Sequence, residues 1–286
     1  MTEKKTPLRI EKFSELIDGY RAIFFDSFGV LRDARGILDG VAEVLIELKD
    51  RGKRVYVLTN DSSRSPQELA RALEHPVFGQ LISPDQIISS GLLTTRYLAR
   101  KVSGTVAFLG KDASAHYIRA AGIRAIPVSE CGDEEINALA LLDDEGFDWN
   151  ADLNAALNLA RRGPIPVVVA NADLAYPSDS ENIALAVGSL ARMLEGVLGR
   201  RFIYFGKPDT SIFSYGWAQV QAIEPEISKD DVLMVGDTLE TDILGANQFG
   251  IPSALVLSGN TREADAARGI EGSAILPDHI CRSIME

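Results

Sequence analysis

The sequence predicts an α/β protein: a doubly wound, Rossmann-like parallel-sheet core with a second α/β domain inserted into it. Short apolar runs that suit buried strands alternate with helical stretches along the 286 residues. Four of these runs also stop abruptly at polar residues, namely at Asp26, Thr59, Lys207 and Asp237. In an open parallel sheet, ligands bind at the carboxyl ends of the strands, so these four positions are candidate site residues.

The first part of the core is a strand, helix, strand unit. Val41, Val44, Leu45 and Leu48 follow the spacing of one helical face, and a glycine turn then leads into a β-branched run. Such a connection is right-handed and its strands are parallel. The elements expected here are strand 23–25, helix 41–50, strand 54–59, a helix that begins after the N-cap Ser65, a short strand within 84–91 and helix 92–101.

A second alternation of strands and helices begins near Gly104 and has enough elements for its own core. We therefore predict an inserted α/β domain at residues 103–202, with residues 1–102 and 203–286 forming the main domain. Its expected elements are strand 105–109, helix 113–121, extended 124–128, strand 138–142, helix 150–161, strand 167–170 and helix 182–198. The main domain is expected to resume with strand 202–205, helix 211–223, strand 232–235, helix 242–249 and strand 254–256.

Composition excludes several classes of protein. A net charge of −12 disfavours nucleic acid as a partner, because phosphate backbones require clustered Lys and Arg. Two cysteines are too few for a disulfide framework, and the Lys-rich start lacks the apolar stretch of a signal peptide. No apolar run approaches the ~18 to 20 residues that span a bilayer. We expect a soluble cytoplasmic protein without a membrane segment.

Each polar strand end, taken alone, has a plain explanation as a helix N-cap or a turn. Together they supply a carboxylate (Asp26), a hydroxyl and an amide (Thr59-Asn60), a cation (Lys207) and an acidic pair (Asp237 and Asp242). Phosphoryl transfer to a carboxylate needs a nucleophile, a cation and donors for the phosphoryl oxygens. The order and types of these residues therefore favour a phosphotransferase site over a set of unrelated caps.

In order and type, these residues resemble the haloacid dehalogenase superfamily of phosphotransferases, over nearly the whole chain. Within it the chain is similar to the class IIA phosphatases, which carry a large α/β cap. Gly206-Lys207-Pro208 follows a long insertion after Thr59-Asn60, and the stretch 60–65 is similar to the loop that follows the second motif of that class. The resemblance implies a hydrolase that acts on a small phosphorylated metabolite and needs Mg²⁺. It also makes a homodimer possible, since caps of this family often pair.

We expect Asp26 to be the nucleophile, which would form an aspartyl-phosphate that water then hydrolyses. Thr59, the backbone amide of Asn60 and the Lys207 ammonium are expected to bind the phosphoryl oxygens. Mg²⁺ prefers oxygen ligands, so Asp26 and Asp237 suit it.

The resemblance adds the backbone carbonyl of Phe28 as a metal ligand. Asp242 is expected to orient the metal shell or Lys207 rather than to bind the ion directly. In the cap, Asn171 and Asp173 resemble a loop that family caps extend toward the substrate.

Phe28 departs from the family pattern. Most phosphatases of the superfamily carry an Asp at this place, and it protonates the leaving oxygen. Without it, we expect either a substrate with a good leaving group or an acid supplied by the cap. An aromatic residue here is also found in metal-independent 2-haloacid dehalogenases of the superfamily, which is one alternative. Another is a catalytically weak module that only binds a phosphorylated ligand.

Overall fold

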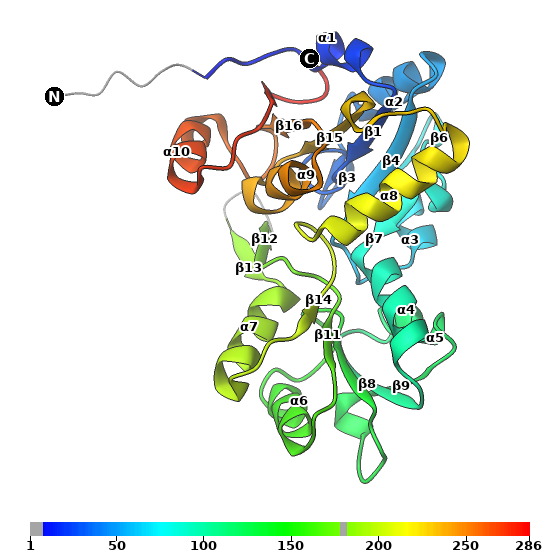
Figure 1. Ribbon diagram of the computed structural model, residues 1–286, viewed down its shortest axis with the longest axis vertical. Helices are drawn as coiled ribbons and strands as arrows, with labels where there is room; N and C mark the ends of the chain where they lie inside the picture. Colours follow the sequence, from blue (N-terminus) through cyan, green and yellow to red (C-terminus); the bar gives the residue numbers. More distant parts are fainter. Residues whose placement is uncertain (1–7, 178–181) are drawn as a thin grey trace, which may run out of the picture. The chain divides into compact units, whose positions relative to one another are not determined.

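The computed structural model describes residues 8–177 and 182–286 (Figure 1). The chain divides into two compact units, and both are discontinuous in sequence. Unit 1 comprises the described residues of Met1–Val57, Leu73–Ile82 and Gly216–Glu286, and unit 2 comprises those of Leu58–Ala72 and Ser83–Tyr215. Among the described residues, no helix combines the length and the apolar character that a membrane-spanning segment requires.

The main sheet has six strands in the order β17-β16-β15-β1-β4-β7, which confirms the predicted doubly wound α/β fold. The pairs β17–β16, β16–β15, β15–β1 and β1–β4 are all parallel. Strand order reverses between β1 and β15, because the chain first builds outward from β1 and later returns to its other side. The bounds are β1 Ala22–Phe25, β4 Arg54–Thr59, β7 Ile87–Ser89, β15 Val232–Gly236, β16 Ser253–Val256 and β17 His279–Cys281.

The sequence explains why these strands lie inside the molecule. All four residues of β1 and all five of β15 are buried, as expected for central strands that are covered on both faces. Helix α2 covers Val41–Asp50, as predicted, and buries Val41, Leu45 and Leu48. The other helices that lie wholly in unit 1 are α1 Phe13–Leu16, α9 Leu244–Phe249 and α10 Glu263–Ser273, and a π-helical turn, η5 Leu239–Ile243, precedes α9.

Unit 2 contains a parallel five-stranded sheet in the order β14-β11-β10-β8-β9. Successive residues of β8 point into two different apolar clusters: Ala107 and Leu109 join one, Val106 and Phe108 the other. The first cluster includes residues of α6 and α7, and the second includes residues of α4 and α5. The sheet is therefore covered by helices on both faces.

The strands of unit 2 are β8 Thr105–Leu109, β9 Arg124–Pro127, β10 Ala138–Leu141, β11 Val167–Val169 and β14 Ile203–Tyr204. The helices are α3 Pro66–Arg71, α4 Ser90–Lys101, α5 His116–Arg119, α6 Ala151–Arg162 and α7 Val187–Leu198, and α8 Thr210–Ile223 runs across the division between the units. Helix α3 begins at the predicted N-cap, where Ser65 and Glu68 form a capping box.

Two predicted elements are wrong. The strand expected at 202–205 does not return to the main sheet, because β14 pairs with β11 of the unit 2 sheet, Val168 opposite Ile203. A short apolar run carries no information about which sheet will accept it. The helix expected at 182–198 begins only at Val187, and Ile183–Leu185 is β13, paired antiparallel with β12 (Ala175–Pro177). The domain boundary at residues 103–202 stays a prediction.

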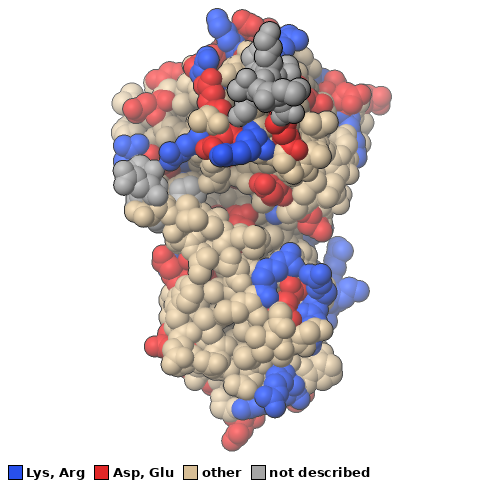
Figure 2. Space-filling view, turned by 90° about the vertical axis from the view of Figure 1, so that its left-hand side faces the viewer, with Lys and Arg blue, Asp and Glu red and all other residues tan. Residues whose placement is uncertain are grey.

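Short antiparallel ladders, which the sequence analysis did not anticipate, complete the fold. They are β2 Arg32–Asp33 with β3 Gly36–Ile37, and β5 Glu74–His75 with β6 Gly79–Gln80. On the face drawn in Figure 2, acidic and basic side chains lie beside one another rather than in a single basic stripe.

Candidate active site

The main sheet brings Asp26 and Asp237 together at the point where its strand order reverses. Asp26 follows β1, and Asp237 follows β15, its parallel neighbour, with Phe25 opposite Val235. The backbone N–H of Asp26 continues the ladder by donating to the carbonyl of Val235 at 2.9 Å. Such a switch point leaves a crevice at the carboxyl ends of the strands, where ligands of α/β proteins bind.

Three carboxylates meet at this edge of unit 1. Asp26, Asp237 and Asp242 each offer one oxygen, and these atoms all lie within 4.8 Å of one another. Asp237 and Asp242 are 1% and 0% exposed, and Asp26 is half-buried. Buried like charges at this separation repel each other and lose hydration unless a cation compensates them. Hard oxygen donors in this number fit Mg²⁺, so the residues present suit the ion that the sequence predicts.

Close backbone packing holds Asp237 in place. Its Oδ2 accepts a hydrogen bond from the Asn260 N–H at 2.7 Å, and its Oδ1 accepts one from the Thr238 hydroxyl at 2.8 Å. A Cβ added at Gly29 or Gly259 would lie 2.1 or 1.8 Å from the same Oδ2. Both glycines are needed because the carboxylate occupies the space that a side chain would take. No pattern in the sequence had singled out Gly259 or Asn260 as site residues.

Asp242 lies over the end of β15. Its Oδ2 accepts a hydrogen bond from the Thr238 N–H at 3.1 Å. A Cβ added at Gly236 would lie 2.2 Å from the Cβ of Asp242. This contact ties the first turn after the strand to the carboxylate cluster. Phe28 is partly exposed and forms a bridge with Arg32, whose guanidinium carbon lies 5.9 Å from the ring centroid. The role of the Phe28 carbonyl as a ligand stays a prediction.

The remaining predicted site residues belong to unit 2, where Asn60 joins Lys207 to Asp173. The Asn60 side chain accepts from the Lys207 N–H at 2.7 Å and donates to the Lys207 carbonyl at 2.9 Å and to Asp173 Oδ1 at 2.8 Å. Thr59 Oγ1 accepts from the Asp61 N–H at 3.1 Å, and Asn171 Oδ1 accepts from the Asp173 N–H at 2.8 Å. Lys207 is 2% exposed.

These residues lie where neighbouring strands of the unit 2 sheet end. Lys207 follows β14, Asp173 follows β11, and Asp143 follows β10, in the order of the strands across the sheet. The loop after β4 is attached to the same edge, because Ser62 Oγ donates to the Leu142 carbonyl at 2.6 Å. The predicted phosphoryl-binding residues and the predicted cap loop are therefore parts of one compact unit.

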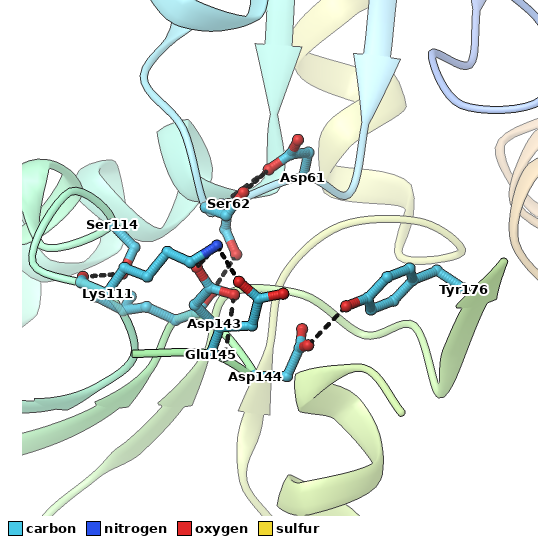
Figure 3. A network of polar contacts seen from close by, with 10 residues as sticks. Asp61, Ser62, Lys111, Ser114, Asp143, Asp144, Glu145 and Tyr176 are labelled. Atoms are coloured by element: carbon cyan, nitrogen blue, oxygen red, sulfur yellow. Dashed lines mark hydrogen bonds and ion pairs between the residues drawn. The ribbon is translucent and has the colours of Figure 1, made fainter. Parts of the chain in front are cut away.

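A polar network that the sequence analysis missed also lies at this edge (Figure 3). Lys111 Nζ is 2.5 Å from Glu145 Oε2 and 3.9 Å from Asp143 Oδ2, and the Tyr176 hydroxyl donates to Asp144 at 2.9 Å. The signal was present in the sequence, since three acidic residues directly follow a buried strand. This is the same pattern that singled out Asp26.

Asp143 is expected to lower the stability of the protein at neutral pH. It is 5% exposed, and burial raises the pKa of its carboxyl group to about 6, against the opposing effect of Lys111. A raised pKa means that the folded state disfavours the charge, so stability falls as pH rises from the unfolded pKa, about 4, to about 6. Asp143→Asn should raise the free energy of unfolding at about pH 8 and change it little at about pH 4.5, as urea titrations would show.

The matched control for Asp143→Asn is Asp133→Asn, which replaces an exposed carboxylate of the same unit. It should leave stability within about 0.5 kcal/mol at both pH values. A gain for Asp143→Asn that is equal at the two pH values would contradict the assignment to a buried charge.

Comparisons with known proteins agree with this geometry. A sequence model of the haloacid dehalogenase-like hydrolases matches residues 23–124, and one described as HAD-hydrolase-like matches residues 204–286. Chronophin from Mus musculus is 30% identical over 290 residues, covering 98% of this chain and 96% of chronophin. Glycerol-3-phosphate phosphatase from Homo sapiens is 27% identical over 305 residues, covering 98% and 93%.

Among solved structures, a possible sugar phosphatase of the HAD superfamily from Cytophaga hutchinsonii superposes with a TM-score of 0.92. It is 48% identical in sequence, and the match covers 98% of this chain and 99% of that one. The fold, the motifs and these relatives agree. The chain therefore belongs to the haloacid dehalogenase-like hydrolases, and within them to the class IIA phosphatase group.

Proposed function

We propose that the protein is a Mg²⁺-dependent phosphatase that hydrolyses a small phosphorylated metabolite through an aspartyl-phosphate on Asp26. Its family makes it a phosphoric monoester hydrolase. The observation that carries the finer proposal is the cluster of Asp26, Asp237 and Asp242 at the switch point of the main sheet. Asp26 is the least buried of the three, as a nucleophile must be.

In the proposed reaction, a carboxylate oxygen of Asp26 attacks phosphorus while the bond from phosphorus to the ester oxygen breaks. The leaving oxygen takes up a proton from the solvent or from an acid of the cap, and the phosphoryl group stays on Asp26. Water then attacks the same phosphorus and gives up a proton to the solvent, the bond from phosphorus to the Asp26 oxygen breaks, and inorganic phosphate leaves with the carboxylate restored. Thr59, the Asn60 N–H and the Lys207 ammonium are proposed to bind the phosphoryl oxygens, whose charge spreads in the transition state.

Asp26, Asp237 and the carbonyl of Phe28 are the residues proposed to hold Mg²⁺, and Asp242 is proposed to support them. The ion supplies positive charge that offsets the charge of the nucleophile and of the phosphoryl group. Support comes from the oxygens within 4.8 Å of one another and from the burial of Asp237 and Asp242. The hydrogen bonds that Asp237 and Asp242 accept pre-orient both carboxylates.

Phe28 lacks the acid that would protonate the leaving oxygen. General acid catalysis contributes roughly 10²- to 10⁴-fold, so alkyl phosphates should react slowly. An aryl phosphate has a better leaving group and needs that proton less. We propose that the natural substrate has a good leaving group or that the cap supplies an acid.

Phe28→Asp is expected to raise kcat/KM for an alkyl phosphate such as glycerol phosphate, by up to about 10²-fold, and much less for p-nitrophenyl phosphate. The physical reason is that only the poor leaving group gains from a proton donor. Phe28→Asn is the matched control, because it has the same shape without the acid. Equal gains on the two substrates, or an equal gain from Phe28→Asn, would contradict the missing-acid explanation.

The alternatives are separated by one set of assays. Mg²⁺-dependent hydrolysis of p-nitrophenyl phosphate, lost in EDTA and in Asp26→Asn, supports the phosphatase. Chloride release from a 2-haloacid that persists in EDTA would support a metal-independent dehalogenase instead. Absence of both activities, with retained binding of a phosphorylated ligand, would support the weak binding module. A panel of phosphorylated metabolites then identifies the substrate.

The protein is proposed to act in the cytoplasm on a small molecule, without nucleic acid or a membrane as partner. A homodimer is proposed as well. It is favoured by exposed apolar side chains on β13 and α7 of unit 2, namely Ile183, Leu185, Met193 and Val197. Such a group of exposed apolar side chains is typical of an interaction surface. Light scattering on the purified protein would test the assembly.

A further inference from the structure

We propose that the side chain of Asn60 is a positioning residue, which holds the backbone of Lys207 and the carboxylate of Asp173 in one fixed arrangement. This inference rests on the proposed function, because it concerns how Lys207 is presented to the phosphoryl group. The side-chain amide of Asn60 forms hydrogen bonds with two segments that are far from it in sequence. Asp173 is 113 residues away and Lys207 is 147 residues away. All three belong to unit 2.

Asn60 binds the backbone of Lys207 through two hydrogen bonds. Asn60 Oδ1 accepts from the Lys207 N–H at 2.7 Å, and Asn60 Nδ2 donates to the Lys207 carbonyl at 2.9 Å. Both residues are buried, at 3% and 2% exposure. A lysine side chain has four flexible carbons, so fixing its backbone from both sides limits the positions of its ammonium group. Alignment of this kind lowers the entropic cost of reaching the transition state.

Residues on both sides of Asn60 restrict the geometry of its contact with Lys207. Gly206 has φ +99, and a Cβ there would lie 2.3 Å from Asn60 Oδ1, so only glycine allows the approach. On the other side, Ser90 Oγ donates to the Asn60 carbonyl at 2.9 Å, and Ser90 is 0% exposed. The backbone of Asn60, whose N–H is the proposed phosphoryl donor, is therefore held by the start of α4.

Asp173 completes the arrangement. The second N–H of Asn60 Nδ2 donates to Asp173 Oδ1 at 2.8 Å, so both side-chain amide protons of Asn60 form hydrogen bonds. Aspartate at position 60 would have no proton for either acceptor, and glutamine would be one methylene too long. The inferred role of Asp173 Oδ1 is to act on the reaction through Asn60, and the predicted part of Asp173 in substrate binding stays a prediction.

The experiment compares Asn60→Ala, Asn60→Asp, Asp173→Asn and the double variant Asn60→Asp/Asp173→Asn. Ser62→Ala is the matched control, since it removes a buried hydrogen bond of the same loop, to the Leu142 carbonyl, outside the Asn60 contacts. Measured are kcat and KM for p-nitrophenyl phosphate, the Tm, and the affinity of each variant for inorganic phosphate by calorimetry. The phosphate measurement does not depend on turnover.

Asn60→Ala should lower kcat/KM about 10²-fold, as a misplaced catalytic group does. Ser62→Ala should lower the Tm by about as much as Asn60→Ala does, because each variant loses a buried hydrogen bond. It should leave kcat/KM within about 3-fold of wild type. Asp173→Asn keeps an oxygen that accepts from Asn60, so it should lower kcat/KM less than Asn60→Ala does. Asn60→Asp should be as slow as Asn60→Ala. In the double variant the amide introduced at position 173 can donate to the carboxylate introduced at position 60, so it should recover about 10-fold of the loss.

Failure of this inference and failure of the proposed function give different results. If wild type shows Mg²⁺-dependent turnover that Asp26→Asn abolishes, but Asn60→Ala is no slower than Ser62→Ala, the positioning role is wrong and the function stands. If wild type shows no turnover, the function is wrong. Phosphate binding then decides, because equal affinity in wild type and Asn60→Ala overturns the positioning role, and a loss of about 10-fold supports it. If Asn60→Ala does not fold, Asn60→Asp is compared with the double variant instead. A recovery of about 10-fold in the double variant, in kcat/KM or in phosphate affinity where there is no turnover, supports the positioning role, and no recovery overturns it.

Discussion

Asp26→Asn is expected to abolish the Mg²⁺-dependent hydrolysis of p-nitrophenyl phosphate, with a loss of at least about 10⁴-fold in kcat. The amide is nearly isosteric with the carboxylate but carries no negative charge, so its oxygen is a far weaker nucleophile toward phosphorus. Asp26 is also the least buried member of the carboxylate cluster, so its replacement should disturb packing little. The measurement is steady-state release of p-nitrophenol.

A second readout tests the intermediate directly. Wild type quenched in acid during turnover should carry a phosphoryl group on the peptide that contains Asp26, as mass spectrometry would show, and the variant should carry none. Asp33→Asn is the matched control, because Asp33 lies in the next strand and pairs with Arg35 instead of with the cluster. An Asp26→Asn variant with more than about a hundredth of wild-type activity would contradict the nucleophile assignment.

Asp237→Asn is expected to remove the response of the protein to Mg²⁺. In wild type, a ligand that binds only the folded state at 100 times its Kd adds about 2.7 kcal/mol to the free energy of unfolding, so saturating Mg²⁺ should raise the Tm. The variant has one charge fewer in the cluster and should lose this rise, together with about 10²-fold or more of kcat/KM. Thermal melts with Mg²⁺ and with EDTA provide the measurement.

The control for Asp237→Asn is Asp265→Asn, which replaces an exposed carboxylate on α10 and should leave the Mg²⁺ response unchanged. The melting data separate metal binding from catalysis, because they require no turnover. If Asp237→Asn keeps the full rise in Tm, the ion is not shared between Asp26 and Asp237, and the proposed mechanism loses its basis.

The sequence predicted five of the six strands of the main sheet, because these strands are short apolar runs separated by recognisable helix signals. It missed β17 and placed residues 202–205 in this sheet. Helix 41–50 has the predicted bounds, and α3 begins at the predicted Ser65 cap. The failures come from segments whose local pattern suits two structures. Residues 183–185 are apolar enough for a helix, yet they form β13 because β12 offers a hydrogen-bonding partner. Pairing of that kind is decided by distant residues.

For the site, the sequence by itself determined which residue types follow which strands, and hence the nucleophile, metal and phosphoryl-binding candidates. This was possible because strand ends in a parallel sheet share one edge. Only the tertiary structure decided that β14, and with it Lys207, belongs to the sheet of unit 2, that Asn60 joins Lys207 to Asp173, and that Gly259 makes room for Asp237. These are contacts between segments far apart along the chain, and no local pattern of residues encodes a distance between them.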